Sequence, residues 1–422
     1  MSRYKAYPDY RVSESKWLGM VPSHWNLFDG KRLFSSRREL AREDDEQLAA
    51  SQKYGVVPQS LMMEMNDAKV MLALKGTSSF RHVGKNDFVI SLRSFEGGIE
   101  HSSYVGCVSP AYTVLQAEKA VVPAYFKYLL KSGPYIAALQ ASTDSLRDGK
   151  SISYEQFGAI PLPYPVADEQ AAIAEFLDHE TAKIDALIEK QQRLIELLKE
   201  KRQAVISHAV TKGLNPNAPM KDSGVEWLGE LPAHWQIKSL RYLGNCQNGI
   251  NIGAEYFGSG YPFVSYGDVY RNDTLPIQVE GLVQSTHTDR EIYSVRTGDI
   301  LFTRTSETVD EIGFSAACLQ TLENATFAGF LIRFRPNTTE VAVYFAKHYF
   351  RSTLMRSYFV QEMNLVTRAS LSQDLLKRLP VPLPPENEQL EIAEYLDAKS
   401  RVFSKLTSNA ETAIQLLKER RT

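Results

Sequence analysis

Two glycine-containing segments resemble parts of cofactor-binding loops, and both depart from the pattern that the chemistry needs. Residues 255–260 imitate the glycine-rich loop of a methyl-donor-binding enzyme, but no apolar strand precedes them. Gly149, Lys150 and Ser151 resemble the end of a phosphate-binding loop, but Asp144 stands where the first glycine is needed. No N-P-P-Y or D-P-P-Y catalytic string occurs, and no carboxylate set makes a convincing nuclease centre. We therefore expect neither a catalytic centre nor a cofactor.

Basic and hydroxyl side chains occur together in loops at matching places in the two halves of the sequence. In each half, one loop follows a predicted strand and the other precedes a proline-rich segment. Arg can pair bidentately with guanine or phosphate, and Ser, Thr and Lys add phosphate contacts. Any one of these residues alone would more ordinarily be solvated, but the matched set favours DNA binding. The candidates are Arg93, Ser94, Arg147, Lys150, Ser151, Arg304, Thr305, Ser306, Arg368 and Ser370.

The elements that must position these loops also occur twice. Residues 86–90 and 298–302 each predict a turn followed by a buried strand. Short helices with aromatic faces are predicted at 122–130 and 341–350. The second half carries about nine extra residues before its short helix, and we place them in the Gly- and Asn-rich segment 248–261.

Each half ends in a long helical pattern, and the two patterns align without a gap at an offset of 219 residues. The first covers residues 168–213 and the second residues 387–421. Asp168 and Asn387 stand at the expected N-cap position, and Gly213 is a strong stop signal. At 1.5 Å per residue these helices are roughly 65 Å and about 50 Å long.

Apolar residues recur along both helices at the spacing of a coiled coil. The principal row passes through positions 177, 184, 191, 198 and 205 and recurs at 396, 403, 410 and 417. A companion row is predicted at 180, 187, 194 and 201 and at 399, 406 and 413. We expect antiparallel helices related by a pseudo-two-fold axis, in a circular arrangement with one globular domain at each end; the alternative is that each helix packs only on its own domain. The residues expected to form the spacer and partner contacts are Leu177, Ile184, Leu187, Ile188, Leu194, Leu198, Leu396, Phe403, Leu406 and Leu417.

The two halves open with matching W-L-G-x-x-P-x-H-W strings, which hold all four tryptophans of the chain. Gly and Pro set a turn in each string, and the tryptophans bury large apolar area. His24 and His234 have no Cys or carboxylate nearby at ligand spacing, so we interpret them as structural.

Alternating prolines at 161–165 and 380–385 lead from each globular part into its long helix. Because proline lacks an N–H donor and fixes an extended backbone, we expect stiff leads rather than strands. The predicted order is a recognition domain at 1–166, a central helix at 167–213, a second recognition domain at 214–385 and a C-terminal helix at 386–422. The fold class is α+β, with two tandem α/β domains separated by the long helices.

Composition places few limits on function. With 422 residues, of which 43% are apolar and 23% are charged, the chain is long enough for two or three domains. The formal net charge of −2 does not by itself suggest nucleic acid, although local basic loops can still bind phosphate. The three cysteines lack metal or disulfide spacing, and no apolar run is long enough for a membrane helix. We expect a cytoplasmic protein with no metal site and no membrane contact.

Across its whole length the chain resembles the specificity subunits of type I restriction–modification systems. The resemblance rests on the paired tryptophan strings, the T-G-D-I-L-F strand at Thr297, the paired proline leads followed by E-Q-x-x-I, and the two long helices. The repeated order of these motifs is more specific than any of them alone.

The resemblance implies a non-catalytic subunit that recognises a bipartite, asymmetric site in double-stranded DNA with an unspecified gap. It also implies two methyltransferase subunits as partners, and with them the restriction subunits that translocate and cut DNA. The separate specificity subunit of a type IIB-like enzyme shares this architecture and remains an alternative. A catalytic methyltransferase or nuclease and a pure coiled-coil scaffold are the alternatives from other classes.

Overall fold

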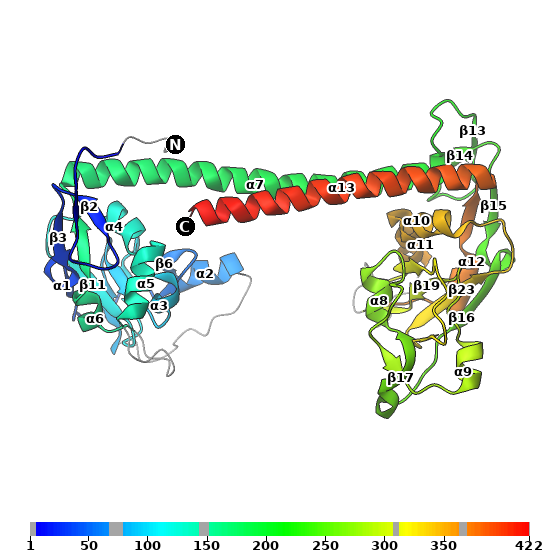
Figure 1. The fold of residues 1–422 in the computed structure, drawn as a ribbon, viewed down its shortest axis with the longest axis horizontal. Helices are drawn as coiled ribbons and strands as arrows, with labels where there is room; N and C mark the ends of the chain where they lie inside the picture. The colour runs from blue at the N-terminus through cyan, green and yellow to red at the C-terminus, as the bar shows by residue number, and fades with distance from the viewer. Residues whose placement is uncertain (1–5, 67–78, 143–151, 307–311, 363–368, 422) are drawn as a thin grey trace. The chain divides into compact units, whose positions relative to one another are not determined.

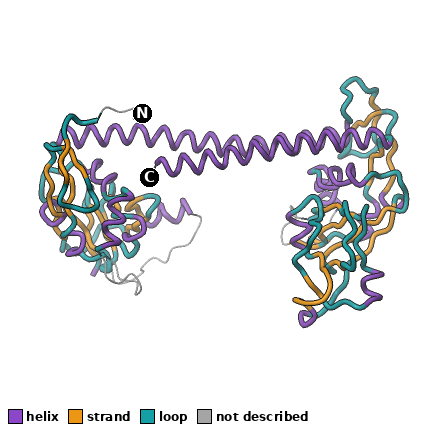
Figure 2. Tube along the Cα trace, viewed as in Figure 1, coloured by secondary structure: helices purple, strands orange, loops and turns teal. Residues whose placement is uncertain are grey.

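A computed structural model describes residues 6–66, 79–142, 152–306, 312–362 and 369–421 (Figure 1). The chain divides into two compact units, Met1–Glu189 with Gln415–Thr422 (unit 1) and Lys190–Ile414 (unit 2). Both units mix short strands with helices (Figure 2). Two long helices, α7 (Ala167–Lys212) and α13 (Glu386–Arg421), contribute to both units. The predicted α+β fold class with two long helices is confirmed.

Unit 1 is organised around one four-stranded antiparallel sheet. Its elements before α7 are β1 (Tyr10–Val12), β2 (Met20–Pro22), β3 (Asn26–Asp29), α1 (Gly30–Leu33), β4 (Phe34–Ser36), β5 (Leu48–Ser51), β6 (Gly55–Pro58), α2 (Gln59–Asn66), β7 (Arg81–Val83), β8 (Phe88–Ile90), α3 (Ser94–Gly97), β9 (Glu100–His101), β10 (Gly106–Val108), β11 (Thr113–Ala117), α4 (Pro123–Leu129), α5 (Gly133–Ala141), α6 (Tyr154–Gly158) and β12 (Pro161–Tyr164). The sheet order is β4-β11-β8-β9. The buried rings of Phe34, Phe88, Phe126 and Phe157 meet edge to face, which joins the sheet to α4 and α6.

Unit 2 repeats this plan and adds a second small sheet. Between α7 and α13 it contains β13 (Met220–Asp222), β14 (Glu230–Pro232), β15 (Gln236–Ser239), η3 (Leu240–Tyr242), β16 (Gly244–Asn248), η4 (Ala254–Tyr256), β17 (Phe257–Val264), α8 (Tyr266–Arg271), β18 (Leu282–Val283), α9 (His287–Ile292), β19 (Ile300–Thr303), β20 (Thr305–Ser306), β21 (Ser315–Ala317), β22 (Thr326–Phe327), β23 (Leu331–Pro336), α10 (Val343–Arg351), α11 (Thr353–Glu362), β24 (Ala369–Ser370), α12 (Gln373–Arg378) and β25 (Pro380–Leu383). The main sheet has the order β16-β23-β19-β21, and the added sheet has the order β18-β17-β22.

The two predicted turn–strand pairs are confirmed as β8 and β19. Both strands are completely buried at the centre of their sheets. The aspartate in each turn forms an ion pair with an arginine: Asp87 with Arg37, which directly follows β4, at 2.8 Å, and Asp299 with Arg335 of β23 at 2.6 Å. The predicted short helices are observed as α4 and α10.

The segment that resembled a methyl-donor loop forms η4 and the start of β17. Gly258 and Gly260 have φ of 93° and 104° at the irregularity where the pairing of β17 with β18 shifts. A Cβ at Gly260 would lie 2.5 Å from the Val283 carbonyl oxygen. The backbone of this bulge therefore accounts for glycine at residue 260.

The proline-rich leads are strands, so the prediction that excluded strand structure there is wrong. β12 pairs antiparallel with β3, and β25 pairs antiparallel with β15. Proline alternates with another residue in each lead, and alternate residues of a strand direct their backbone groups to the same side. The residues between the prolines can therefore supply N–H donors to the partner strand. The sheets are two-stranded, so the proline side needs no donors.

The long helices have nearly the predicted limits. α7 has 46 residues and α13 has 36, which correspond to about 69 Å and about 54 Å. Gly213 adopts φ of 73° and its N–H donates to the Ala209 carbonyl, so it ends α7 as predicted. Asp168 and Asn387 lie inside the first turns rather than at the N-caps, because the helices begin at Ala167 and Glu386.

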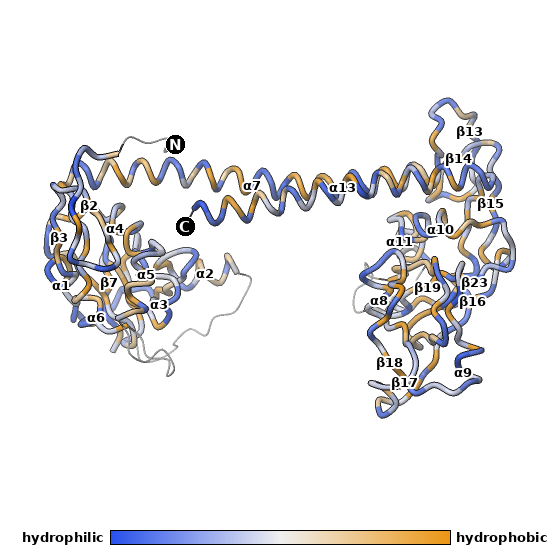
Figure 3. Tube along the Cα trace, in the orientation of Figure 1, coloured by the Kyte–Doolittle hydropathy of each residue, from blue (hydrophilic) through white to orange (hydrophobic). Residues whose placement is uncertain are grey.

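Within unit 2, α7 and α13 pack along the predicted principal row. Leu198, Leu396, Phe403 and Ala410 are all buried there. The hydropathy colouring shows apolar and polar residues alternating along both helices (Figure 3). Ile184 is buried in unit 1, whereas Leu177, Ile188 and Leu417 are half-buried.

The predicted companion row is wrong, because the helices use the row one residue further on. Leu187, Leu194 and Leu406 are 46%, 43% and 44% exposed. The next row is half-buried instead and includes Ile188, Ile195, Ser400, Thr407 and Ile414. The predicted row would have buried the charges of Lys201 and Lys399, and burying unpaired charge is costly.

Candidate functional site

In unit 2 the structure brings four of the predicted DNA-binding residues together in a two-stranded ribbon. β20 pairs antiparallel with β24, so that Thr305 lies opposite Ser370 and Ser306 opposite Ala369. The backbone of Arg304 anchors the ribbon, because its N–H donates to the Phe330 carbonyl (2.9 Å) and its carbonyl accepts from Leu371 (2.7 Å). Residues more than 60 positions apart in the sequence therefore form one element.

This ribbon, which we define as Arg304–Ser306 with Ala369–Ser370, has the chemistry of a DNA-contacting element. Ser370 is exposed, and Arg304 and Thr305 are half-buried at its edge. Hydroxyl groups can donate to and accept from base edges or phosphates, and a two-stranded ribbon fits the major groove of B-DNA. Arg368, which was also predicted, lies outside the described residues.

In unit 1 the structure describes two of the five predicted residues, of which one is exposed and one is buried. Arg93 is exposed just beyond β8. Ser94 is 1% exposed, and its hydroxyl oxygen accepts a hydrogen bond from the Ser91 N–H at 2.8 Å. Because that hydroxyl stabilises its own turn, we remove Ser94 from the candidate DNA contacts. Arg147, Lys150 and Ser151 lie outside the described residues.

Each tryptophan string binds the first turn of a long helix through a glutamate that the sequence reading did not single out. In unit 1, Trp25 Nε1 lies 3.0 Å and His24 Nε2 3.1 Å from the Glu169 carboxylate. In unit 2 the equivalent distances to Glu388 are 3.1 Å from Trp235 and 2.8 Å from His234. The histidines are structural, as predicted, but they do have carboxylate partners, nearly 150 residues away in sequence.

Hydrogen bonds also set the protonation of this anchor in unit 1. Partial burial works against the charged form, but hydrogen bonds from Tyr7, Trp25 and His24 hold the pKa of Glu169 below its usual value. A charged glutamate in the first turn also interacts favourably with the helix dipole.

The glutamine that follows each glutamate fixes the helix to backbone groups of its unit. The buried Gln170 accepts from the Val122 N–H and donates to the Pro165 carbonyl. The buried Gln389 accepts from the Ala342 N–H and donates to the carbonyls of Glu340 and Pro384. The E-Q pair at the same place in both repeats was the sequence signal for these anchors.

A second anchor lies about two turns further along each helix. In unit 1 the Tyr128 hydroxyl donates to Asp178 at 2.6 Å. In unit 2 Lys347 donates to Asp397 at 2.6 Å, and His348 Nε2 lies 2.9 Å from the same carboxylate. Burial, with the neighbouring Lys347 charge, lowers the pKa of His348 to about 4, so His348 is neutral at pH 7.

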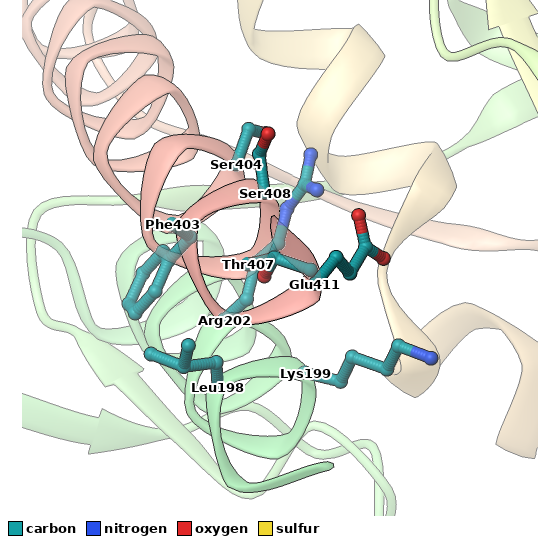
Figure 4. A pocket seen from close by; sticks show the side chains of 8 residues that line it. All are labelled: Leu198, Lys199, Arg202, Phe403, Ser404, Thr407, Ser408 and Glu411. Carbon is teal, nitrogen blue, oxygen red and sulfur yellow. The ribbon is translucent and has the colours of Figure 1, made fainter. Parts of the chain in front are cut away.

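Within unit 2, the two sides of the helix pair have opposite character. One side carries a shallow groove beside the seam, and most of the residues that line it are polar or charged (Figure 4). The groove is lined by Leu198, Lys199, Arg202, Phe403, Ser404, Thr407, Ser408 and Glu411. Because successive helix residues are about 100° apart, Leu194 and Leu406 must lie on the other flank of the seam from Lys199 and Ser404.

The other side of the helix pair is apolar and exposed. We define the unit 2 patch as Leu194 and Leu197 of α7 with Val402 and Leu406 of α13, which are 43%, 45%, 55% and 44% exposed. Lys190, Lys201 and Lys399 are exposed next to the patch, in the same rows of the two helices as the patch residues. In unit 1, Leu187 and Leu416 are 46% and 59% exposed at the matching positions.

Within the described ranges, no group of three or more His, Cys, Asp or Glu side chains could hold a metal ion. The three cysteines are free thiols, and burial raises the pKa values of Cys246 and Cys318 to about 12. Over the same residues, no helix is long and apolar enough to cross a membrane. The two units share three features. Each has side chains that anchor a long helix, each has a ribbon or loop with candidate DNA contacts, and each has apolar residues exposed on one side of the helix pair.

Comparisons with known proteins agree with this architecture. A family model described as "Type I restriction modification DNA specificity domain" matches residues 232–416. The type I restriction enzyme EcoKI specificity subunit of Escherichia coli K12 is 27% identical over 317 residues, which cover 70% of this chain and 63% of that subunit. The StySPI specificity subunit of Salmonella potsdam is 26% identical over 313 residues, which cover 72% of this chain and 64% of that subunit. The aligned part is thus less than two thirds of the length of these relatives.

Solved structures share the fold along nearly the whole chain. The HsdS subunit from Thermoanaerobacter tengcongensis has a TM-score of 0.57 at 16% identity and matches over 95% of this chain and 97% of its own. A chain from a study of "complex assembly" and "conformational transition of the type I R-M system" has a TM-score of 0.64 at 16% identity, over 95% and 96% of the two chains. At such low identity these likenesses show the fold alone. The family model shows a type I restriction modification DNA specificity domain at residues 232–416, and the curated relatives show that the chain is similar to type I specificity subunits over about 70% of its length.

Proposed function

We propose that the chain recognises a bipartite, asymmetric DNA site and carries no catalytic centre of its own. The observation that carries this proposal is the duplication itself, in which the helix anchors are kept and the exposed recognition elements differ. Glu169 and Glu388 are held by the same pair of side chains in both units. Two copies of one identical unit would favour a palindromic site, whereas two divergent units favour two different half-sites.

The proposed division of labour follows the repeat. Residues 1–166 and 214–385 are the two target-recognition domains, and residues 167–213 and 386–422 are the helices between them. In the second domain the ribbon contacts base edges, with Thr305 and Ser370 side by side. In the first domain Arg93 does so, together with Arg147, Lys150 and Ser151, which lie outside the described residues.

The long helices act as a spacer that sets the distance between the two half-sites. The packed seam of Leu198, Leu396, Phe403 and Ala410 supports this role, because a paired helix bends less than a single one. Two recognition elements must contact DNA at a fixed separation, commonly about 34 Å between half-site centres. Both helices are longer than that distance.

The exposed apolar side of the helices is where the modification subunits dock. The unit 2 patch is apolar at its centre and has lysines around it, so its complement is an amphipathic helix with an acidic margin. Leu187 and Leu416 match Leu406 and Leu197 in the repeat, so the same kind of surface is present twice. Two matched surfaces support two copies of one methyltransferase subunit, and through them the restriction subunits.

The direct test is methyl transfer by purified components. The chain, incubated alone with DNA and a methyl donor, should transfer no methyl groups. Addition of the cognate modification subunit should produce methylation at two adenine- or cytosine-containing half-sites separated by a fixed gap. Methyl transfer by the chain alone, or site-selective methylation by the modification subunit without the chain, would contradict the proposal.

A further inference from the structure

The two apolar surfaces on the helices are related by the repeat, but they are not equal. At the offset of 219 residues, Leu406 corresponds to Leu187 and Leu197 corresponds to Leu416, so two positions are leucine in both. All four of these leucines are 44–59% exposed. A common docking mode on both surfaces would therefore use these two positions.

At the other two positions of the unit 2 patch, unit 1 has a charged residue and a smaller apolar residue. Val402, which is 55% exposed, corresponds to Lys183, whose Nζ lies 2.8 Å from the Glu180 carboxylate. Leu194 corresponds to Ala413, one turn before Leu416 in the same helix. The copy in unit 1 thus offers a smaller apolar centre and one additional charge.

Each change lowers the expected affinity of an apolar partner surface. Replacing leucine by alanine removes three carbon atoms, so docking takes less apolar area out of water at that position. Docking over Lys183 must also strip water from its ammonium group or displace it from Glu180. Both differences weaken binding at unit 1 relative to unit 2.

We infer that the two copies of the modification subunit bind with unequal affinity, first at the unit 2 patch of Leu194, Leu197, Val402 and Leu406 and then at the matching surface of unit 1. This inference rests on the proposed function, because it requires the modification subunit to dock on these helices. It adds an order of assembly and a stable complex with a single modification subunit.

The test is a titration of the full-length chain with the purified cognate modification subunit, followed by calorimetry and native mass spectrometry. The one-to-one complex should accumulate before the complex with two modification subunits, with dissociation constants at least tenfold apart. Val402→Lys should weaken the first binding step at least fivefold. Lys183→Val should strengthen the second step and narrow the difference between the two constants.

Ser408→Lys is the matched control, because it adds the same charge to an exposed position of α13 that lines the groove, on the other flank of the seam from the patch. It should leave both constants unchanged. The inference would be overturned if the unmodified chain had two equal and independent sites. It would also be overturned if Val402→Lys and Lys183→Val changed neither dissociation constant. Either result would leave the proposed function intact. Absence of any binding would overturn both.

Discussion

At the scale of single residues, the two units attach their long helices through equivalent carboxylates with different partners. Asp178 accepts from the neutral hydroxyl of Tyr128, whereas Asp397 contacts the ammonium of Lys347 and the imidazole of His348. His348 and Lys347 are almost fully buried, and Asp273 adds a further charge to their surroundings. The attachment in unit 2 therefore depends on a histidine that must stay neutral.

The pKa of His348 predicts an acid-sensitive attachment. Its folded value of about 4 lies below the ordinary 6.5, so an unfolded chain binds a proton that the folded one does not. The stabilisation is complete above pH 6.5 and is lost as the pH falls toward 4. Amide hydrogen exchange in α10 should show the opening free energy falling by up to about 3 kcal/mol over this range.

His348→Gln keeps a donor for Asp397 but does not titrate, so it should flatten this dependence between pH 6.5 and 4. An equal slope in the variant and the unmodified chain would assign the acid sensitivity to other groups. The equivalent amides of α4, which contains no histidine and contacts Asp178 through Tyr128, provide an internal reference.

Sequence reasoning identified the residues of the tryptophan strings but not their partners. Trp25 and Glu169 are 144 positions apart, and nothing local to either residue indicates that contact. The burial of Ser94 was missed for the opposite reason, because burial of a hydroxyl in its own turn depends on packing that spacing does not report. Among the described candidates, the ribbon could be predicted as a set of residues but not as paired strands.

At the scale of elements, the helix pair should behave as a ruler with a coiled-coil period. Removal of one heptad keeps the seam in phase and brings Leu194 into the place of Leu187. Removal of the repeat-matched heptad, residues 406–412, shortens α13 equally. Seven residues correspond to about 10 Å of helix, or roughly three base pairs of DNA at 3.4 Å each.

Deletion of residues 187–193 alone should therefore shift the permitted gap or abolish assembly, and the paired deletion should shorten the gap by about three base pairs. The measurement is methylation of a set of DNA duplexes whose half-sites are separated by different gaps. A two-residue deletion of 187–188 turns the seam by about 200° and should prevent assembly. Unchanged methylation of the original site by the heptad variant would contradict the spacer role.

The elements themselves were largely predictable, with two instructive exceptions. Helix limits came within a few residues because Gly213 and the heptad rows are local signals. The companion row could not be chosen from apolarity alone, since both Leu194 and Ile195 are apolar and only packing shows which one is covered. The proline leads form strands because a two-stranded sheet requires donors on one side only, which depends on the partner strand.

At the scale of the whole molecule, a gene duplication explains both what is shared and what differs. The anchors at Glu169 and Glu388 and the principal row of the helices are kept in both copies. The recognition elements and the apolar surfaces differ between the two units, which supports the proposals of two different half-sites and of ordered partner binding. An asymmetric target with a fixed gap would require recognition elements that differ between the units, while the anchors and the helix packing stay the same.

The central claim is that each unit independently recognises one half-site. The most direct test replaces residues 1–165 with the corresponding unit of another specificity subunit, reconstitutes the complex with its modification subunit, and maps every methylated base on genomic DNA. The account predicts that one half of the target changes while the other half and the gap length stay the same. A target that is unchanged, or one in which both halves change, would contradict it.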